Sequence, residues 1–401
     1  MIEFENVKIF TDNIDETALK QLRELVDTGI FEGQPIRIMP DCHAGAGCVI
    51  GFTSPVKDKI IPNLVGVDIF CGMLWVPLGN IDIDLKQLDE FIHEEIPAGR
   101  KVNTNGGGND LVARGIIAEL HCKDHLQNME WLERSLGTLG GGNHFIEVDA
   151  DEDGNKYLVI HSGSRNLGKQ VAEYYQNLAV KECRSTDVQK IIDELKARGR
   201  EREISAVIAA EKANHPKLPK NLCYLEGQSM KDYLHDMWVC SRFARTNRAI
   251  IAIKILHWLG LNHADYILSA YTTLHNYCYK ENGQTIIRKG AISAKEGERV
   301  LIPLNMRDGC IIGIGKGNPE WNYSAPHGAG RIMSRAVAKE KVNVEDFKNA
   351  MSGIYTTTAD ENTIDESPFA YKPSEEIISL VKETVEIEKI IKPIYNFKAT
   401  E

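Results

Sequence analysis

The segment Gly66-Val-Asp-Ile-Phe-Cys-Gly-Met carries a carboxylate and a thiol at a spacing that suits metal binding. Asp68 and Cys71 stand three positions apart between glycines, so a tight loop can turn both side chains toward one point. Carboxylates and thiolates are both anionic metal ligands. The alternative is a small buried cysteine, the commoner fate of a single cysteine in such a segment. Spacing alone leaves both interpretations of Cys71 open.

Two histidines can join this pair if the chain between them folds as a β-hairpin. The apolar stretches 145–148 and 157–160 flank the turn-like Asp151-Glu-Asp-Gly154, which predicts a symmetric register with His144 opposite His161. The four side chains would then form a mixed sulfur, nitrogen and oxygen set, suited to two metals bridged by one thiolate. The alternative is that both histidines are hydrogen-bonded residues at strand ends.

A glycine-rich segment and an arginine adjoin these candidate ligands. Gly137-Thr-Leu-Gly-Gly-Gly-Asn-His frees backbone N–H groups to approach an anion and leaves Asn143 at the rim, although a tightly turned loop would also need such glycines. Arg165 is expected immediately before a helix that starts near Lys169. Its guanidinium could hold a phosphate beside the metals or pair with a local carboxylate.

A further histidine is a candidate nucleophile. In Ser324-Ala-Pro-His-Gly-Ala-Gly-Arg, His327 precedes an expected amphipathic helix through Ile332, Met333, Ala336 and Val337, whose amino terminus would favour a phosphate. A neutral imidazole can attack phosphorus if another group orients its far nitrogen. The alternative is a histidine that caps the helix. Neither a P-loop nor the Lys-x-Asp-Gly tetrapeptide of lysine-based nucleotidyl transfer occurs in the sequence.

Composition predicts a folded cytoplasmic protein. Hydrophobic residues make up 43% and charged residues 26%, and the net charge of −10 argues against a surface coated for non-specific nucleic-acid binding. No apolar run approaches the ~18 residues of a membrane span, and the amino terminus does not resemble a signal peptide. The nine scattered cysteines suit reduced thiols.

Hydrophobic periodicity predicts an α+β fold. Glycine-bearing, β-rich stretches at about 36–78, 134–168 and 266–328 alternate with helical patterns at 169–212 and 229–259. Asn282-Gly283 predicts a second hairpin, which places His275 near a strand end away from the turn. Without a repeat or a long linker, residues 1–401 are expected to form a single domain.

Ordered motifs across the chain closely resemble those of the RtcB RNA ligases. They are Met39-Pro-Asp-Cys-His-Ala-Gly, Gly66-Val-Asp-Ile-Phe-Cys-Gly-Met, Gly140-Gly-Gly-Asn-His-Phe, His161-Ser-Gly-Ser-Arg, His275-Asn, Pro326-His-Gly-Ala-Gly-Arg and Asp365-Glu-Ser-Pro. The resemblance implies a single-domain RtcB-type fold with central β-sheets flanked by helices. It also implies RNA, and not DNA, as the substrate.

The resemblance further implies GTP as cofactor and two manganese ions. By position, the metal ligands would be Asp68, Cys71, His144, His161 and His275, with Cys71 bridging both ions, and Arg165 would face the RNA phosphate. The implied nucleotide-binding residues are Asn143, His144, Phe145, Ile146, Glu147, His275, Asn276, Pro303, Leu304, Asn305, Met306, Cys310, His327, Gly328, Ala329, Gly330 and Lys398.

The implied reaction joins an RNA 3′-phosphate or 2′,3′-cyclic phosphate to a 5′-hydroxyl through a guanylyl group on His327, in tRNA splicing or RNA repair. Typical members carry a Pro-Gly-Ser-Met-Gly loop, whereas this chain has Pro303-Leu-Asn-Met-Arg-Asp-Gly-Cys310, so the nucleotide loop gains Arg307 and loses its glycine. We expect the metal and guanylylation chemistry to be retained, with altered substrate ends or an altered choice of RNA. Two alternatives are a metal-dependent phosphodiesterase or phosphatase that needs no nucleotide, and a catalytically inactive RNA-repair binding protein.

Overall fold

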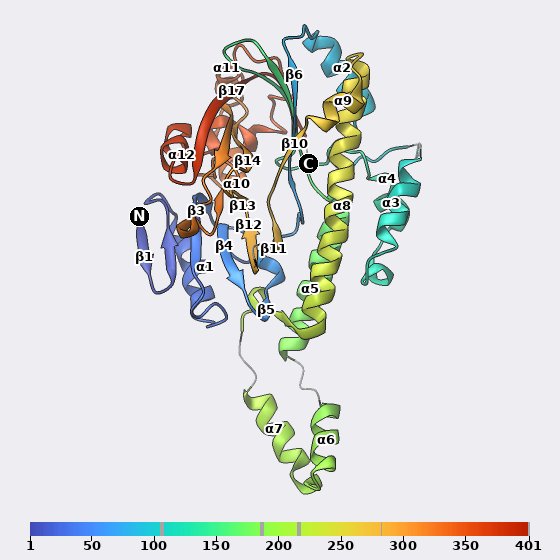
Figure 1. Cartoon of the computed structure of the whole chain (residues 1–401), viewed down its shortest axis with the longest axis vertical. Coiled ribbons are helices and arrows are strands. Elements are labelled where there is room, and N and C mark those ends of the chain that lie inside the picture. Colours follow the sequence, from blue (N-terminus) through green and yellow to red (C-terminus); the bar gives the residue numbers. More distant parts are fainter. Residues whose placement is uncertain (105–107, 185–187, 215–217, 282, 400–401) are drawn as a thin grey trace.

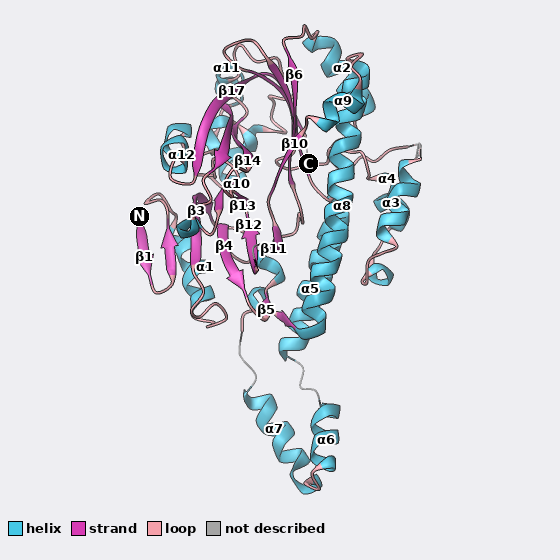
Figure 2. Ribbon diagram, viewed as in Figure 1, coloured by secondary structure: helices cyan, strands magenta, loops and turns pink. Residues whose placement is uncertain are grey.

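Two β-sheets lie side by side, with a long helix along one flank of the molecule (Figure 1). The computed structural model describes residues 1–104, 108–184, 188–214, 218–281 and 283–399. Figure 2 shows strands gathered in the body and helices around them, so the fold class is α+β, as predicted. Within the described residues, no helix combines the length and apolar character that crossing a bilayer requires. All nine cysteines are free thiols.

The first sheet supports one wall of the site. Strands β2 (Val7–Ile9) and β3 (Ile36–His43) pair in parallel, and all other neighbouring strands of this sheet pair antiparallel. Helix α1 (Glu16–Val26) begins at Asp15, whose side chain accepts from the Ala18 amide, and it packs Leu22 against the sheet. The strand order is β1 (Ile2–Phe4), β2 (Val7–Ile9), β3 (Ile36–His43), β4 (Ile50–Val56), β12 (Gln284–Lys289) and β11 (Tyr277–Glu281).

The second sheet is antiparallel and apolar on both faces. Side chains along strand β7 (Phe145–Ala150) point alternately to the two faces of the sheet. Ile146 and Val148 pack into a core shared with helix α2 (Leu85–Glu95), and Phe145 packs into a separate core on the opposite face. The strand order is β10 (Tyr271–Leu274), β6 (Gly72–Gly79), β8 (Lys156–Ser162), β7 (Phe145–Ala150), β17 (Val385–Lys398), β15 (Gly309–Gly315) and β14 (Arg299–Asn305).

The first predicted hairpin exists, but its register is shifted by one residue. Phe145, and not His144, pairs with His161 across β7 and β8. The reason is that Asn155 belongs to the turn, because the Asp151 carboxylate accepts from the Asn155 amide as well as from that of Asp153. The predicted turn ended at Gly154, one residue too early.

The second predicted hairpin has the expected register. Glu281 pairs with Gln284 next to the turn, and Gly283 has φ +83°, a positive value that a two-residue hairpin turn requires. Asn282, the other half of that signal, lies outside the described residues. His275 follows β10, at the end of the hairpin away from the turn.

Helices surround the sheets largely where the periodicity predicts them. The predicted stretch 229–259 is α8 (Gly227–Trp258), and the stretch 169–212 contains α5 (Arg165–Arg184), α6 (Val188–Ala197) and α7 (Ile204–Asn214). The α6–α7 pair projects from the lower end of the body in Figure 1. The remaining helices and strands are α3 (Asn109–Ile117), α4 (Met129–Arg134), α9 (His263–Leu268), α10 (Arg335–Lys341), α11 (Val344–Ala350), α12 (Ser374–Val381), β5 (Lys59–Ile60), β9 (Leu225–Glu226), β13 (Ala291–Ser293) and β16 (Ser324–Pro326).

Two predicted helix starts are wrong. α5 begins at Arg165 rather than near Lys169. α10 begins after Ser334, whose side chain accepts from the Val337 amide as a cap, so Ile332 and Met333 precede the helix. His327 therefore lies at the end of β16 and not beside a helix amino terminus.

Helix α8 fixes two loops of the site through buried polar side chains. Asn247 Oδ1 accepts from the amides of Gly137 and Thr138, at 2.7 and 3.0 Å. Arg248 Nη1 donates to the carbonyls of Phe70 and Ser162, at 3.2 and 2.7 Å. The glycine-rich segment and the Asp68–Cys71 loop are thereby tied to one rigid element.

Candidate functional site

The predicted metal ligands converge in the structure. Cys71 Sγ lies 3.3 Å from His144 Nε2 and 3.2 Å from His161 Nε2, and Asp68 Oδ2 lies 3.0 Å from His144 Nε2. The His275 ring centroid lies 5.4 Å from that of His161, and the His275 amide donates to the Cys71 carbonyl. Three loops and strand β8 thus bring together the Cys71 cluster, which consists of Asp68, Cys71, His144, His161 and His275.

A backbone carbonyl sets the tautomer of His161. His161 Nδ1 lies 3.1 Å from the Asn143 carbonyl, which can only accept, so Nδ1 carries the proton and Nε2 directs a lone pair toward Cys71. His144 Nδ1 lies between the Leu139 carbonyl and the guanidinium of Arg165, so these contacts do not select one tautomer. Asp68 adds carboxylate oxygens to the same region, and its Oδ1 has no hydrogen-bond donor among the described residues. Such a convergence of acceptors fits a metal cation.

Burial keeps these imidazoles neutral. It lowers the pKa of His144, and it lowers the pKa of His161 and of His275 well below the usual range for histidine. Burial and then the Asp68 charge raise the pKa of the Cys71 thiol well above its ordinary value. A bound cation reverses that tendency, because a coordinated thiol ionises. The donor set is therefore suited to binding a metal as neutral imidazoles, a carboxylate and a thiolate.

The imidazole of His327 is held by a carboxylate. Asp41, on β3, is fully buried, and its Oδ2 lies 2.7 Å from His327 Nδ1. The same oxygen accepts from the backbone amides of His327 and Gly328. An ionised carboxylate only accepts, so the proton is on Nδ1 and the Nε2 lone pair is free. The ring centroid of His327 lies 4.8 Å from that of His275, which places the candidate nucleophile beside the candidate metal ligands.

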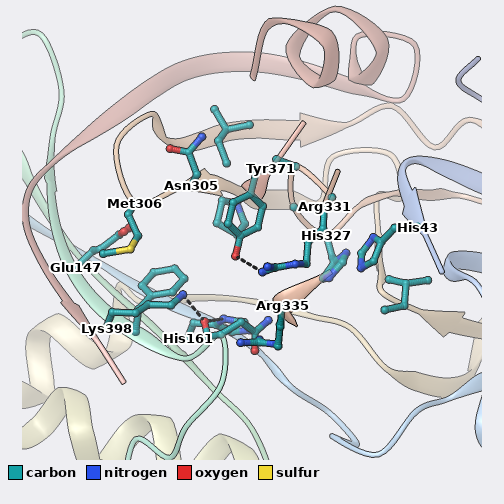
Figure 3. Close-up of a pocket in the computed structure, with 18 residues that line it drawn as sticks. His43, Glu147, His161, Asn305, Met306, His327, Arg331, Arg335, Tyr371 and Lys398 are labelled. Carbon is teal, nitrogen blue, oxygen red and sulfur yellow. Dashed lines mark hydrogen bonds between the residues drawn. The ribbon is translucent and has the colours of Figure 1, made fainter. Parts of the chain in front are cut away.

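A pocket opens beside His327 (Figure 3), and most of the predicted nucleotide-binding residues line it. The predicted residues on its wall are Asn143, Phe145, Glu147, Pro303, Leu304, Asn305, Met306, His327, Gly328, Ala329, Gly330 and Lys398. Others on its wall are His43, Ile50, His161, Arg331, Arg335 and Tyr371. A single cavity thus joins the glycine-rich segment, the β14–β15 hairpin and the His327 loop.

Several predicted nucleotide-binding residues lie behind this wall. Ile146 points to the opposite face of β7, because neighbouring strand residues alternate. Asn276 braces two loops, since it donates to the Asp68 carbonyl and accepts from the Gly290 amide. His144 and His275 belong to the group of predicted metal ligands, and Cys310 faces Glu147 at 4.0 Å inside the sheet core.

The cations of the pocket surround one buried carboxylate. Lys398 Nζ lies 2.8 Å from Glu366 and donates to the Asn143 carbonyl, while Arg331 and Arg335 also contact Glu366. Burial opposes ionisation, but these three charges outweigh it and lower the pKa of Glu366 to about 2. The cluster presents positive charge to the pocket, as a polyphosphate would require.

Arg165 lies against the predicted metal ligands. Its Nη1 is 2.9 Å from His144 Nδ1, and its guanidinium fills the space above Gly140, where an added Cβ would lie 1.3 Å from Nη2. Gly140 is therefore needed for close approach of the arginine. The structure thus places Arg165 beside His144, and its contact with an RNA phosphate stays a prediction.

The divergent loop turns its charged part away from the pocket. Arg307 pairs with Asp308 at 2.8 Å and is absent from the pocket wall, whereas Pro303 to Met306 remain on it. The Asn305 side chain accepts from the amides of Arg307 and Asp308, which closes the turn. The structure therefore does not bring Arg307, which the divergent loop gains, to the pocket side of the loop.

Sequence reasoning missed several residues of the site. Asp41, Arg331 and Glu366 lie inside motifs that carry the family resemblance, so the motifs were the available signal. No comparable signal marks Arg335 and Tyr371, which reach the pocket from α10 and from the segment before α12.

Comparison with known proteins places this chain in one protein family. The family described as tRNA-splicing ligase RtcB matches residues 21–120 and 109–399. The chain belongs to the RtcB family, as the motifs predicted.

Individual relatives agree along nearly the full length. The RNA-splicing ligase RtcB of Escherichia coli K12 is 32% identical over 418 residues, which cover 95% of this chain and 94% of that protein. The tRNA-splicing ligases RtcB of Aeropyrum pernix and Archaeoglobus fulgidus are each 28% identical, over 84% and 86% of this chain and 81% and 83% of theirs.

Proposed function

We propose that the protein is a GTP- and manganese-dependent RNA ligase that acts in tRNA splicing or RNA repair. It would join an RNA 3′-phosphate, or a 2′,3′-cyclic phosphate, to a 5′-hydroxyl. The observation that carries the proposal is the Asp41–His327 contact of 2.7 Å, which leaves Nε2 unprotonated at the pocket. A hydrolase that relied on the metals alone would have no use for a histidine activated in this way.

The proposed reaction begins at His327 Nε2. This atom forms a bond to the α-phosphorus of GTP as the bond to the β-phosphate oxygen breaks and pyrophosphate leaves. A 2′,3′-cyclic phosphate end is first opened by water to a 3′-phosphate with a free 2′-hydroxyl. The guanylyl group then passes from Nε2 to the RNA 3′-phosphate, which frees the imidazole. In the last step the 5′-hydroxyl attacks the activated phosphate and GMP departs. Throughout, Asp41 holds the proton on Nδ1 and stabilises the imidazolium character that develops in the ring.

Other residues bind and orient the reactants. Arg331, Arg335 and Lys398 offer positive charge to the triphosphate, and Arg165 to the RNA phosphate. Asp68, Cys71, His144, His161 and His275 would hold two manganese ions, whose charge offsets that of the reacting phosphates.

A ligation assay with defined ends tests the proposal. RNA ending in a 3′-phosphate or a 2′,3′-cyclic phosphate is paired with 5′-hydroxyl RNA, with and without GTP and Mn²⁺. We expect a joined product that requires both additions. Phosphate release that is indifferent to GTP would indicate a phosphodiesterase or phosphatase, and RNA binding without joining would indicate an inactive binding protein. Either result contradicts the proposal.

A further inference from the structure

A second group of potential metal ligands lies in the core of the second sheet. Glu147 and Asp149 are two residues apart on β7 and share one face, and Cys310 reaches the same point from β15. One ligand atom from each lies within 4.8 Å of the others, and Cys310 Sγ is 4.0 Å from Glu147 Oε2. All three side chains are buried.

The surroundings of this group are apolar. Cys310 packs with Met73, Trp75, Val159 and Ile391 in one hydrophobic cluster. Burying a carboxylate among such side chains is costly unless the charge is compensated. The two carboxyl groups and the thiol therefore need either protons or a cation.

Few polar partners among the described residues satisfy these acceptors, and Asp149 has none. Both oxygens of Asp149 are buried and have no hydrogen-bond donor there. Asn396 donates to Glu147 Oε1 at 2.5 Å, which leaves Oε2 toward Cys310, and its own Oδ1 is buried without a donor. Several lone pairs thus converge on one small region, as they do at the Cys71 cluster.

Burial also disfavours the charged forms of these carboxyl groups. Burial and then the Glu147 charge raise the pKa of Asp149 well above its usual range, although the nearby Cys310 thiol opposes them. Burial raises the pKa of Glu147 to about 7, against the Asn396 hydrogen bond and the Lys398 charge. Lys398 itself is engaged with Glu366. The charge available nearby is too small to compensate two carboxylates and a thiolate.

We propose that Glu147, Asp149 and Cys310 bind a transition-metal ion of the Zn²⁺ class, at a site separate from the Cys71 cluster. A thiolate with two carboxylates is a mixed donor set that suits zinc, which accepts sulfur and oxygen ligands in a four-coordinate shell. Binding displaces the thiol proton, and any proton on the two carboxyl groups, to solvent. Because Glu147 also lines the pocket, the ion would fix one wall of that pocket from behind. The inference does not rest on the proposed ligase activity.

Cobalt(II) titration of the full-length Cys71→Ala variant tests this site. That substitution removes the thiolate of the other cluster, so any thiolate-to-cobalt charge-transfer absorption must come from another cysteine. We expect the absorption in Cys71→Ala and its loss in Cys71→Ala/Cys310→Ser. The matched control is Cys71→Ala/Cys278→Ser, in which Cys278 is a buried strand cysteine outside the groups described above. This control should keep the absorption.

A second variant keeps the test decisive if Cys310→Ser fails to fold. Asp149→Asn in the Cys71→Ala background preserves shape but removes a charged ligand, and it should weaken cobalt affinity at least ~10-fold. The zinc content of the Cys71→Ala protein should also fall when Asp149→Asn is added. Absence of the absorption from Cys71→Ala, its persistence without Cys310, or an unchanged affinity in Asp149→Asn would overturn the proposal and leave protons as the compensating charge.

Discussion

Asp41 Oδ2 lies 2.7 Å from Nδ1 of His327, although 286 residues separate the two along the chain. The contact decides which nitrogen of the imidazole can act. With the proton held on Nδ1, the Nε2 lone pair is available, and the carboxylate can stabilise positive charge as a bond to phosphorus forms. His327 and Asp41 thus form a nucleophile with its orienting group beside the predicted metal ligands.

The first prediction concerns Asp41→Asn. An amide can present its NH₂ group to Nδ1, which favours the tautomer with the proton on Nε2 and removes the lone pair. We expect guanylylation of His327 to slow on the order of 10²- to 10⁴-fold, as in other histidines that lose an orienting carboxylate. Single-turnover kinetics with labelled GTP measure this. Asp58→Asn, at an exposed carboxylate, is the control and should react at the wild-type rate. Equal rates in both variants would refute the role of Asp41.

The second prediction concerns acid stability and His43. Burial lowers the pKa of His43 to about 4, so the unfolded chain takes up this proton below pH 6.5 while the folded protein does not. The free energy of unfolding therefore falls as the pH drops through that window, by at most about 3 kcal/mol from this residue. Above pH 6.5 the contribution is constant, because both states are neutral there.

Denaturant unfolding as a function of pH measures the effect. His43→Asn keeps a donor for the Asp41 carbonyl, to which His43 Nδ1 lies 2.9 Å away, but cannot titrate. The difference in unfolding free energy between wild type and His43→Asn should change between pH 6.5 and pH 4. The exposed His263→Asn should show no such change. A pH-independent difference for His43→Asn would count against a buried, neutral His43.

The third prediction compares two glycines with nearly the same backbone. Gly140 and Gly154 have φ of +82° and +81°, so alanine at either position costs ~1–2 kcal/mol of stability. At Gly140 the new Cβ would also collide with Arg165, whereas at Gly154 the nearest atom is 3.8 Å away. We expect Gly140→Ala to weaken binding of 3′-phosphate RNA by roughly 10-fold, the loss of one charge-assisted contact. Gly154→Ala should bind normally, and equal affinities would exclude Arg165 from phosphate binding.

The fourth prediction concerns the divergent loop. Because Arg307 faces Asp308 and lies off the pocket wall, Arg307→Ala should leave the affinity for GTP within about twofold of wild type, since an exposed ion pair contributes little. Lys398→Ala, which removes a cation from the pocket wall, should weaken the affinity for GTP by roughly 10-fold or more. Isothermal titration calorimetry measures the affinity of each variant for GTP. A large effect of Arg307→Ala would contradict this account, because it would mean that the arginine contacts the nucleotide.

Local sequence signals predicted much of the candidate site. The glycine-bearing loops around Asp68, Cys71 and His144 were recognisable because close backbone approach demands glycine and metal binding demands those donors. The β7–β8 hairpin was recognisable from its alternation. Its register was not, because the choice depends on whether Asn155 joins the turn through the Asp151 side chain.

Contacts between distant segments were beyond local signals. Asp41 reaches His327 because β3 and β16 approach one another in the folded chain, and Arg248 reaches the Phe70 carbonyl from the middle of α8. Spacing along the chain carries no information on such pairs. Likewise, the sequence prediction did not recognise Ser334 as the residue that caps α10, and it therefore placed the start of this helix before Ile332.

Mass spectrometry of the intact protein after incubation with GTP and Mn²⁺ tests the central claim most directly. We predict one guanylyl adduct, mapped to His327 by peptide fragmentation, absent from His327→Ala and absent when a chelator removes the metal. His263→Ala, at an exposed histidine, should form the adduct normally. Failure of the wild-type protein to form an adduct, or an adduct that survives in His327→Ala, would contradict the account.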